Sequence, residues 1–333
     1  MKYDLNSLYD QALPASLSNF LNYLDTIRGK SVNTIAGYKI DLTMFFRFLK
    51  MYKGYTDKKT EFNEIKINDI DKDFLNSITL PDIYAFISFV ENYRDNKSYA
   101  RARKIAAIRS FFKYLHTKEK ILKENPAQDL ETPKLEKRNP IYLTLKESKN
   151  LLSSIDGDNK ERDYCIITLF LNCGLRLSEL VSIDIPKIKG DILTVVGKGN
   201  KERTIYLNPA SINSINDYLI IRNEFNEFKD KIKEDKDALF ISRNMKRINK
   251  RTVELIVKKW ISKAGIENEK MSPHKLRHTA ATLMYKYGNV DIRSLQQILG
   301  HENVSTTQIY THVDSEKLRE AVNLNPLSHE KKK

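Results

Sequence analysis

Apolar residues recur at helical spacing through most of the chain, and this periodicity restricts the fold more than any other feature. It runs through residues 14–50, 80–93 and 100–115, and the first stretch fits two helices. Side chains three and four residues apart lie on one face of a helix and can pack together. Pro81 suits the first turn of the second stretch, where no backbone N–H is needed. We therefore predict an all-helical first domain.

A stretch rich in proline, residues 125–140, interrupts this pattern. It contains Pro126, Pro133 and Pro140, which resist helix formation, so we predict an interdomain linker there. The chain has 333 residues, which is enough for two domains with their own cores. We expect a first domain over residues 1–124, a second over 141–325 and a disordered basic tail over 326–333.

The second domain is expected to begin with a helix capped by Thr144 and to continue with a buried helix over residues 162–172. Apolar residues no longer recur at helical spacing in residues 191–207. Instead, β-branched residues lie on both sides of the turn Gly197-Lys198-Gly199-Asn200, which is typical of a β-hairpin. Helical patterns resume from residue 211. The predicted fold class is mainly α, with an α+β second domain that holds a small sheet.

The net charge of +14 favours a polyanionic partner, either nucleic acid or an anionic membrane surface. Residues 97–123 contain nine basic residues against one acidic, and residues 243–263 contain eight against one. A soluble basic enzyme is the simplest alternative. Because the charge is concentrated in two runs, we favour nucleic acid. The residues that we predict to contact DNA are Arg101, Lys104, Lys113, Arg243, Arg247 and Arg251.

Apolar stretches and cysteine content bear on where in the cell the protein is expected. The longest apolar stretch, residues 164–171, is far shorter than the roughly 20 residues of a membrane span, and residues 1–10 lack the apolar core of a signal peptide. Cys165 and Cys173 are too few for a disulfide framework. We therefore expect a cytoplasmic protein with no membrane partner.

An arginine lies where one helix ends and the next begins. Gly174 ends the apolar helix, and Arg176 follows at the start of the next one. A guanidinium group beside free backbone N–H groups can bind a phosphate through two donors. The simpler interpretation is a surface arginine paired with Glu179 three residues later.

Lys198 lies in the predicted hairpin turn, where the neighbouring glycines leave its side chain free to reach outward and donate a proton. An ordinary hairpin lysine is the alternative. The turn is no nucleotide-binding loop, because the pattern G-x-x-x-x-G-K-[ST] is absent.

Ser272 and Pro273 predict the start of a helix that places His274 and Arg277 one turn apart, where both can reach one anion. His274 and His278 also have the spacing of a helical zinc pair. Lys275 stands where a zinc protease has its catalytic glutamate, and the charge of Arg277 opposes a dication, so we predict no metal and no cofactor.

Two further candidates follow in the last part of the second domain. His301 comes directly after Gly300, and Tyr310 lies on the next predicted helix. Two arginines, two histidines, a lysine and a tyrosine suffice for metal-free attack of a phenolate on a phosphodiester. Tyrosine has an ordinary pKa near 10, so ionising it at pH 7 costs about 4 kcal/mol, which cationic neighbours can offset.

These motifs resemble the tyrosine recombinase (phage integrase) family. The segments that carry the resemblance are Gly174–Leu180, Gly197–Arg203, His274–Thr279, Leu299–His301 and Thr307–His312, in this order. The resemblance runs from Ser16 to His312 and in length is closest to the Xer-type site-specific recombinases. It implies an N-terminal helical core-binding (SAM-like) domain and a C-terminal catalytic domain.

The resemblance also implies a reaction. Tyr310 would attack the scissile phosphate, form a 3′-phosphotyrosyl link and release a 5′-hydroxyl, so that rejoining needs no ATP. Lys198 would protonate the leaving oxygen, and His274 would assist proton transfer at the tyrosine.

The remaining matched positions concern binding and orientation. Arg176, Arg277 and His301 would hold the non-bridging oxygens, Glu179 would orient them, and His278 would be structural. The family further implies double-stranded DNA with an inverted-repeat site, a homo- or hetero-tetramer on two duplexes, a possible DNA translocase partner, and a C-terminal helix, here residues 315–322, that docks on a neighbouring subunit.

Several alternatives stay open at this point. Resolution of chromosome or plasmid dimers and integration of a mobile element use the same chemistry, and the short segment before residue 14 favours dimer resolution. A DNA-binding protein of the same fold without catalysis would explain the charge, and a metallohydrolase would use His274 and His278. The target site and the regulatory partner are not encoded in any motif.

Overall fold

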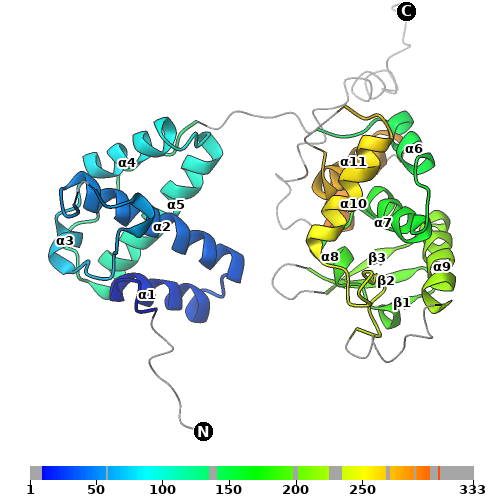
Figure 1. Ribbon diagram of the computed structural model, residues 1–333, viewed down its shortest axis with the longest axis horizontal. Helices are drawn as coiled ribbons and strands as arrows, with labels where there is room; N and C mark the ends of the chain where they lie inside the picture. The colour runs from blue at the N-terminus through cyan, green and yellow to red at the C-terminus, as the bar shows by residue number, and fades with distance from the viewer. Residues whose placement is uncertain are drawn as a thin grey trace, which may run out of the picture. The chain divides into compact units, whose positions relative to one another are not determined.

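The computed structural model in Figure 1 has two compact units, residues 1–137 and 138–333, which are treated separately below. The residues that the structure describes are 10–57, 59–134, 141–197, 202–224, 235–267, 271–288, 290–300 and 307. The predicted tail, residues 326–333, and the predicted C-terminal helix, residues 315–322, lie outside them.

The regular elements described in the first unit are all helical, as its sequence predicts (Figure 1). Its α-helices are α1 (Ala15–Asn22), α2 (Val32–Tyr52), α3 (Lys72–Asn76), α4 (Leu80–Asn92) and α5 (Ser98–Tyr114). Two short π-helical segments, Tyr23–Ile27 and Leu115–Glu119, extend α1 and α5, and a 3₁₀ turn covers Phe62–Glu64. The helical fold class predicted for this domain is confirmed.

Phenylalanine rings form the centre of the first unit. Phe45 and Phe46 on α2 are fully buried, and their rings meet Phe86 of α4 and Phe111 of α5 edge to face, with centroids 5.1 and 5.6 Å apart. Edge-to-face pairs add about 0.5–1.5 kcal/mol each to the gain from burial. This core therefore joins α2, α4 and α5 into one body.

The structure differs from the predicted linker at its start. Ala127 and Leu130 are buried in the core of the first unit, where Asn125 Oδ1 accepts a hydrogen bond from the Ala127 N–H at 3.0 Å. Proline resists helix formation, but residues 126–129 form turns that present two apolar side chains to the core. Residues 125–130 are thus part of the first unit, while 135–140 lie outside the described residues.

Lys104, one of the residues predicted to contact DNA, does not face the solvent. Its side chain is buried, and its Nζ donates to Asp41 Oδ1 at 2.8 Å, while Arg103 pairs with the other carboxylate oxygen at 2.7 Å. Asp41 is itself fully buried on α2, so this face of α5 meets a carboxylate instead of solvent. Arg101 is also largely covered and forms an ion pair with Glu91.

The second unit holds the remaining helices and a small sheet (Figure 1). Its helices are α6 (Leu145–Ser153), α7 (Lys160–Cys173), α8 (Leu177–Val181), α9 (Pro209–Glu224), α10 (Lys250–Lys263), α11 (Pro273–Tyr287) and α12 (Ile292–Leu299), with a 3₁₀ turn at Ile185–Lys187. Thr144 caps α6 as predicted, because its hydroxyl accepts from the Glu147 N–H. No described helix in either unit is long and apolar enough to span a membrane.

Helix α7 runs through the core of the second unit, which explains its nearly continuous apolar sequence. It packs against both α9 and α11, and its residues from Cys165 to Leu171 are all buried. Near its start, Asp163 accepts hydrogen bonds from the Arg162 guanidinium group and from Trp260 Nε1, the latter at 2.9 Å. The buried carboxylate therefore has charged and neutral donors, as a buried polar group requires.

The sheet is antiparallel, with the order β1 (Ile188–Lys189), β2 (Ile192–Val196) and β3 (Glu202–Tyr206). The predicted hairpin is formed by β2 and β3, whereas the short β1 is an addition that the sequence did not predict. Leu193 pairs with Ile205 and Val195 with Arg203, which sets Arg203 on the same face as buried apolar residues. A shift of one residue in the strand pairing would place these side chains on the opposite face of the sheet.

We expect Lys104→Ala to lower the free energy of unfolding of the first unit by about 3 kcal/mol, because it removes one partner of a buried ion pair. Trp260, the one tryptophan of the chain, reports on the second unit, so urea unfolding followed by far-UV circular dichroism and by tryptophan fluorescence separates the two. The exposed Lys113 on the same helix provides the control Lys113→Ala, and equal shifts for both variants would contradict the expectation.

Candidate active site

The turn between α7 and α8 brings the first arginine into position. Gly174 ends α7 with φ of +59°, a conformation that glycine adopts without steric cost, and Arg176 is the N-cap residue of α8. A Cβ atom at Gly174 would lie 2.9 Å from Leu299 Cδ2. The end of α12 therefore packs directly on this turn.

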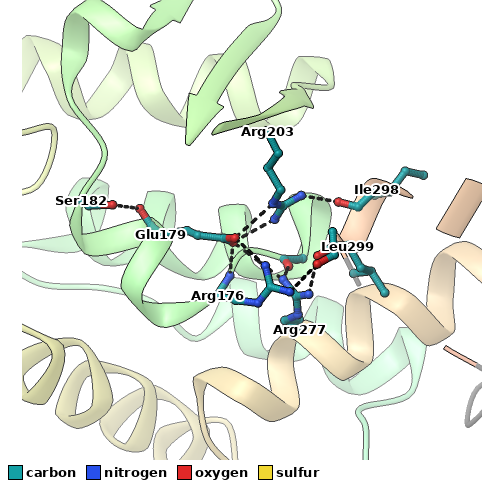
Figure 2. A network of polar contacts seen from close by, with 9 residues as sticks. Arg176, Glu179, Ser182, Arg203, Arg277, Ile298 and Leu299 are labelled. Atoms are coloured by element: carbon teal, nitrogen blue, oxygen red, sulfur yellow. Dashed lines mark hydrogen bonds and ion pairs between the residues drawn. The ribbon is translucent and has the colours of Figure 1, made fainter. Parts of the chain in front are cut away.

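Glu179 is fully buried, and the described arginines around it converge on its carboxylate (Figure 2). Arg176 donates its backbone N–H at 2.7 Å and Nη1 at 2.8 Å, while Arg203 donates Nε at 3.1 Å and Nη2 at 2.8 Å. Arg277 lies 3.8 Å from the same carboxylate. Burial alone would raise the pKa of Glu179, but hydrogen bonds and charge from Arg203, together with the bonds from Arg176, hold that pKa below its usual value.

The same three arginines also hold the C-terminal end of α12. Three successive backbone carbonyls each accept from a different guanidinium group: Ile298 from Arg203 Nη1, Leu299 from Arg277 Nη2 at 2.6 Å, and Gly300 from Arg176 Nη2 at 2.6 Å. Arg277 Nη1 also donates to the Gly174 carbonyl at 2.6 Å. Carbonyls at the end of a helix carry partial negative charge, so cations are favoured there.

These contacts leave a positively charged site that can bind an oxyanion. Three guanidinium groups face one carboxylate in this network, so positive charge is in excess. The Arg176 side chain is 31% exposed, whereas those of Arg203 and Arg277 are 13% and 3% exposed. Arg176 is therefore the member of the three that is most open to a ligand.

His274 lies at the start of α11, next to this cluster. Its Nε2 is 3.0 Å from Nε2 of His278, one turn further along the helix. Partial burial, and then the positive charges of Lys275, Arg277 and Arg176, lower the pKa of His274. The ring is therefore neutral at pH 7 and able to accept a proton.

Among the residues that the structure describes, no three or more His, Cys, Asp or Glu side chains are grouped so that they could hold a metal ion. The two histidines that would have formed the zinc pair are hydrogen-bonded to each other.

Helix α11 begins where the sequence predicts. Ser272 is its N-cap residue, and Pro273 lies in its first turn.

The structure brings together Arg176, Glu179 and Arg277 of the predicted site. Lys198, His301 and Tyr310 lie outside the described residues. Arg203 also belongs to the cluster, and although it stands in the motif after the hairpin turn, no role was predicted for it. A charged residue at a core-facing position of a predicted strand was the signal that could have found it.

The predicted DNA-contacting residues of the second unit differ in exposure. Arg243 is exposed, and the Arg251 side chain is 77% exposed with Glu254 as an ion-pair partner. Arg247 instead pairs with Asp184 at 2.6 Å and also lies 3.6 Å from Asp235. Exposed cations can meet a phosphate directly, whereas Arg247 would first have to give up a protein partner.

Comparison with known proteins decides which family this arrangement represents. The phage integrase family model matches residues 142–317, and the model of the phage integrase N-terminal SAM-like domain matches residues 17–119. Tyrosine recombinase XerC of Caldanaerobacter subterraneus subsp. tengcongensis is 59% identical over 95% of this chain and 88% of that protein. The chain belongs to the phage integrase family.

Other relatives place this phage integrase family member among the Xer-type site-specific recombinases. Tyrosine recombinase XerC of Thermodesulfovibrio yellowstonii is 35% identical over 94% of this chain and 97% of that one. Tyrosine recombinase XerD of Proteus mirabilis is 34% identical over 91% and 90%. The predicted resemblance is therefore confirmed, including the SAM-like first domain.

Solved structures share the fold of this integrase family member. The XerH recombinase bound to its difH substrate matches with a TM-score of 0.65 and 22% identity, over 92% of this chain and 84% of that one. A lambda integrase dimer bound to a COC′ core site matches with a TM-score of 0.62 and 17% identity, over 88% and 96%. The mainly helical two-domain fold class is confirmed.

We expect Gly300→Ala to destabilise the second unit more than Gly265→Ala does. Both glycines have φ near +60°, so each alanine costs about 1 kcal/mol of backbone strain. A Cβ atom at Gly300 would also lie 2.8 Å from Arg203 Cδ, whereas at Gly265 it would meet nothing within 4 Å. Urea unfolding followed by Trp260 fluorescence measures the difference, and equal losses would contradict the close packing at Gly300.

We expect His274 to titrate below the ordinary histidine value of about 6.5 and to move upward in Arg176→Gln, which removes one of the lowering charges. Because the folded-state pKa is the lower one, the contribution of His274 to stability is complete above the unfolded pKa and is lost as the pH falls through the folded pKa. Histidine NMR titrations measure both values. A His274 pKa unaffected by the substitution would contradict the assignment.

Proposed function

We propose that this recombinase cuts and rejoins DNA through a 3′-phosphotyrosyl intermediate formed by Tyr310. The phenolic oxygen forms a bond to the scissile phosphorus while the bond from phosphorus to the 5′-oxygen breaks. Lys198 gives its proton to that leaving oxygen, so a 5′-hydroxyl is released. Rejoining reverses these steps with a partner strand, and the phosphodiester energy is kept in the tyrosyl link.

The observation that carries this proposal is the excess of positive charge at Arg176, Glu179 and Arg277. The attacked phosphate gains negative charge in the transition state, and fixed donors directed at that charge are each worth on the order of a hundredfold in rate. Arg176 and Arg277, with His301, would hold the non-bridging oxygens. Glu179 orients both guanidinium groups, since it contacts each of them.

His274 would assist proton transfer at the tyrosine. Its lowered pKa supports this role, because a histidine that is neutral at pH 7 can accept a proton. Nearby positive charge also lowers the cost of ionising a phenol, which is about 4 kcal/mol at pH 7 for an ordinary tyrosine. His278 would fix the orientation of the His274 ring through the contact between their Nε2 atoms.

Double-stranded DNA with an inverted-repeat site is the proposed partner. The XerH and lambda integrase structures were determined with DNA substrates, which supports this choice. We propose that exposed Lys113, Arg243 and Arg251 contact phosphates first. Arg101 and Arg247 would do so after releasing their ion-pair partners, while the burial of Lys104 argues for a structural role instead.

The biological role proposed is the resolution of chromosome or plasmid dimers. The similarity to XerC and XerD over more than nine-tenths of the chain supports it. Such a reaction would use a homo- or hetero-tetramer on two duplexes, with a DNA translocase as a further partner, in the cytoplasm at the nucleoid. Integration of a mobile element is the second candidate, because the Tn1549 transposon integrase shares the fold with a TM-score of 0.65 at 15% identity.

We expect Tyr310→Phe to abolish covalent trapping on a suicide DNA substrate nicked near the cleavage point, because the variant lacks the attacking oxygen. Its DNA affinity should stay within about twofold, since one phenolic oxygen is a small part of a phosphate-dominated interface. Denaturing gels measure the trapped complex, and mobility shifts measure binding.

Lys104→Ala is the matched control, because Lys104 lies outside the proposed chemistry. The folded fraction of this variant should still form the covalent complex. If Tyr310→Phe still formed a covalent complex with DNA, another residue would be the nucleophile. Specific binding by the unaltered protein without any cleavage would favour a non-catalytic DNA-binding protein, and inhibition by chelators would favour the metallohydrolase.

A further inference from the structure

Arg203 is the arginine of the cluster to which the family resemblance assigns no role. It lies on β3 opposite Val195 of β2, and its side chain points toward the helical layer where Glu179 and Ile298 lie (Figure 2). Each of its guanidinium nitrogens donates to a protein acceptor. Nε and Nη2 donate to the two oxygens of Glu179, and Nη1 donates to the Ile298 carbonyl.

These contacts distinguish Arg203 from Arg176. The Arg203 side chain is 13% exposed, against 31% for Arg176, and it bridges two elements instead of facing the solvent. Its acceptors come from α8 and from the last turn of α12, which are more than a hundred residues apart in sequence. Arg203 therefore acts on the protein and not on a ligand.

The close approach at Gly300 shows how tightly this arginine holds the end of α12. A Cβ atom on Gly300 would be 2.8 Å from Arg203 Cδ and 3.6 Å from Arg176 Nη1, so the glycine lies between the two side chains. Gly300 has φ of +62°, and its carbonyl accepts from Arg176 Nη2 at 2.6 Å. The position of the C-terminal end of α12 thus depends on where Arg203 lies.

We propose that Arg203 is a positioning residue for strand cleavage: it clamps the C-terminal end of α12 to Glu179 and thereby sets the Arg176 guanidinium group, which donates to both. This inference rests on the proposed function, in which Arg176 holds the scissile phosphate. A displacement of about 1 Å in such a site lowers the rate by about 100-fold.

A lysine could not replace this arginine. The carboxylate of Glu179 and the carbonyl of Ile298 are bound by different nitrogens of one planar group, a geometry that a single ammonium group on a flexible stem does not reproduce. Arg203 also contributes most to keeping the Glu179 carboxylate ionised against its burial. Both the shape and the charge of the guanidinium group are therefore used.

The test compares Arg203→Lys and Arg203→Gln with Thr204→Val, a substitution at the adjacent exposed position of the same strand. Single-turnover cleavage of a nicked suicide substrate is measured at saturating protein, with Trp260 fluorescence to verify folding. We expect both Arg203 variants to bind DNA within about threefold of the unaltered protein and to cleave about 100-fold more slowly. Thr204→Val should cleave at the unaltered rate.

A second substrate, with sulfur in place of the bridging 5′-oxygen, shows which part of the site Arg203 acts on. A thiolate leaves without a proton, because thiols ionise near pH 8.5, so this substrate bypasses the proposed proton donor. We expect Lys198→Ala to recover most of its rate on this substrate and the Arg203 variants to stay slow. A merely weakened strand would not produce this contrast.

The outcomes separate this inference from the function on which it rests. If the unaltered protein forms no covalent complex, the proposed function fails. If it does so and Arg203→Lys cleaves at the unaltered rate, the positioning role is overturned while the function stands. Recovery of the Arg203 variants on the sulfur substrate would also overturn it, since Arg203 would then act through the Lys198 hairpin. If Arg203→Gln does not fold, Arg203→Lys decides.

Discussion

The buried carboxylate of Glu179 is the interaction on which the proposed active site of this recombinase depends. A buried charge is tolerated only when partners surround it, and here the partners are arginines from three different parts of the chain. Each arginine that neutralises Glu179 also donates a hydrogen bond to a backbone carbonyl at the end of α12. One carboxylate, through its arginines, therefore joins α8, β3, α11 and α12, and the cluster keeps an excess of positive charge.

The rest of the second unit keeps that arrangement rigid. Helix α7, buried along most of its length, ends at Gly174, whose carbonyl accepts from Arg277 and whose missing Cβ makes room for Leu299. Close contacts of this kind transmit small displacements, because protein interiors are packed as densely as crystals. The first unit repeats the principle with Asp41, whose buried carboxylate joins α2 to α5 through Lys104 and Arg103.

Sequence patterns predicted much of this correctly, and the misses have physical causes. Apolar periodicity identified the helices, and the β-branched residues around Gly197 identified the hairpin. The choice of Lys104 as a DNA contact missed its burial, because neither a charge run nor a helical pattern shows whether a neighbouring helix offers a carboxylate. It ended the first domain at residue 124, because proline content does not show whether Ala127 and Leu130 find a core.

The order of residue types along the chain was by itself enough to establish the family, the two-domain organisation and the pairing of Arg176 with Glu179, since that pair lies within one helical turn. Only the tertiary structure decided that Arg203 joins them. Its partners, Glu179 and Ile298, are 24 and 95 residues away in sequence, and a contact across such separations depends on sheet register and helix packing. Local patterns encode neither, because both arise from the cooperative packing of the whole unit.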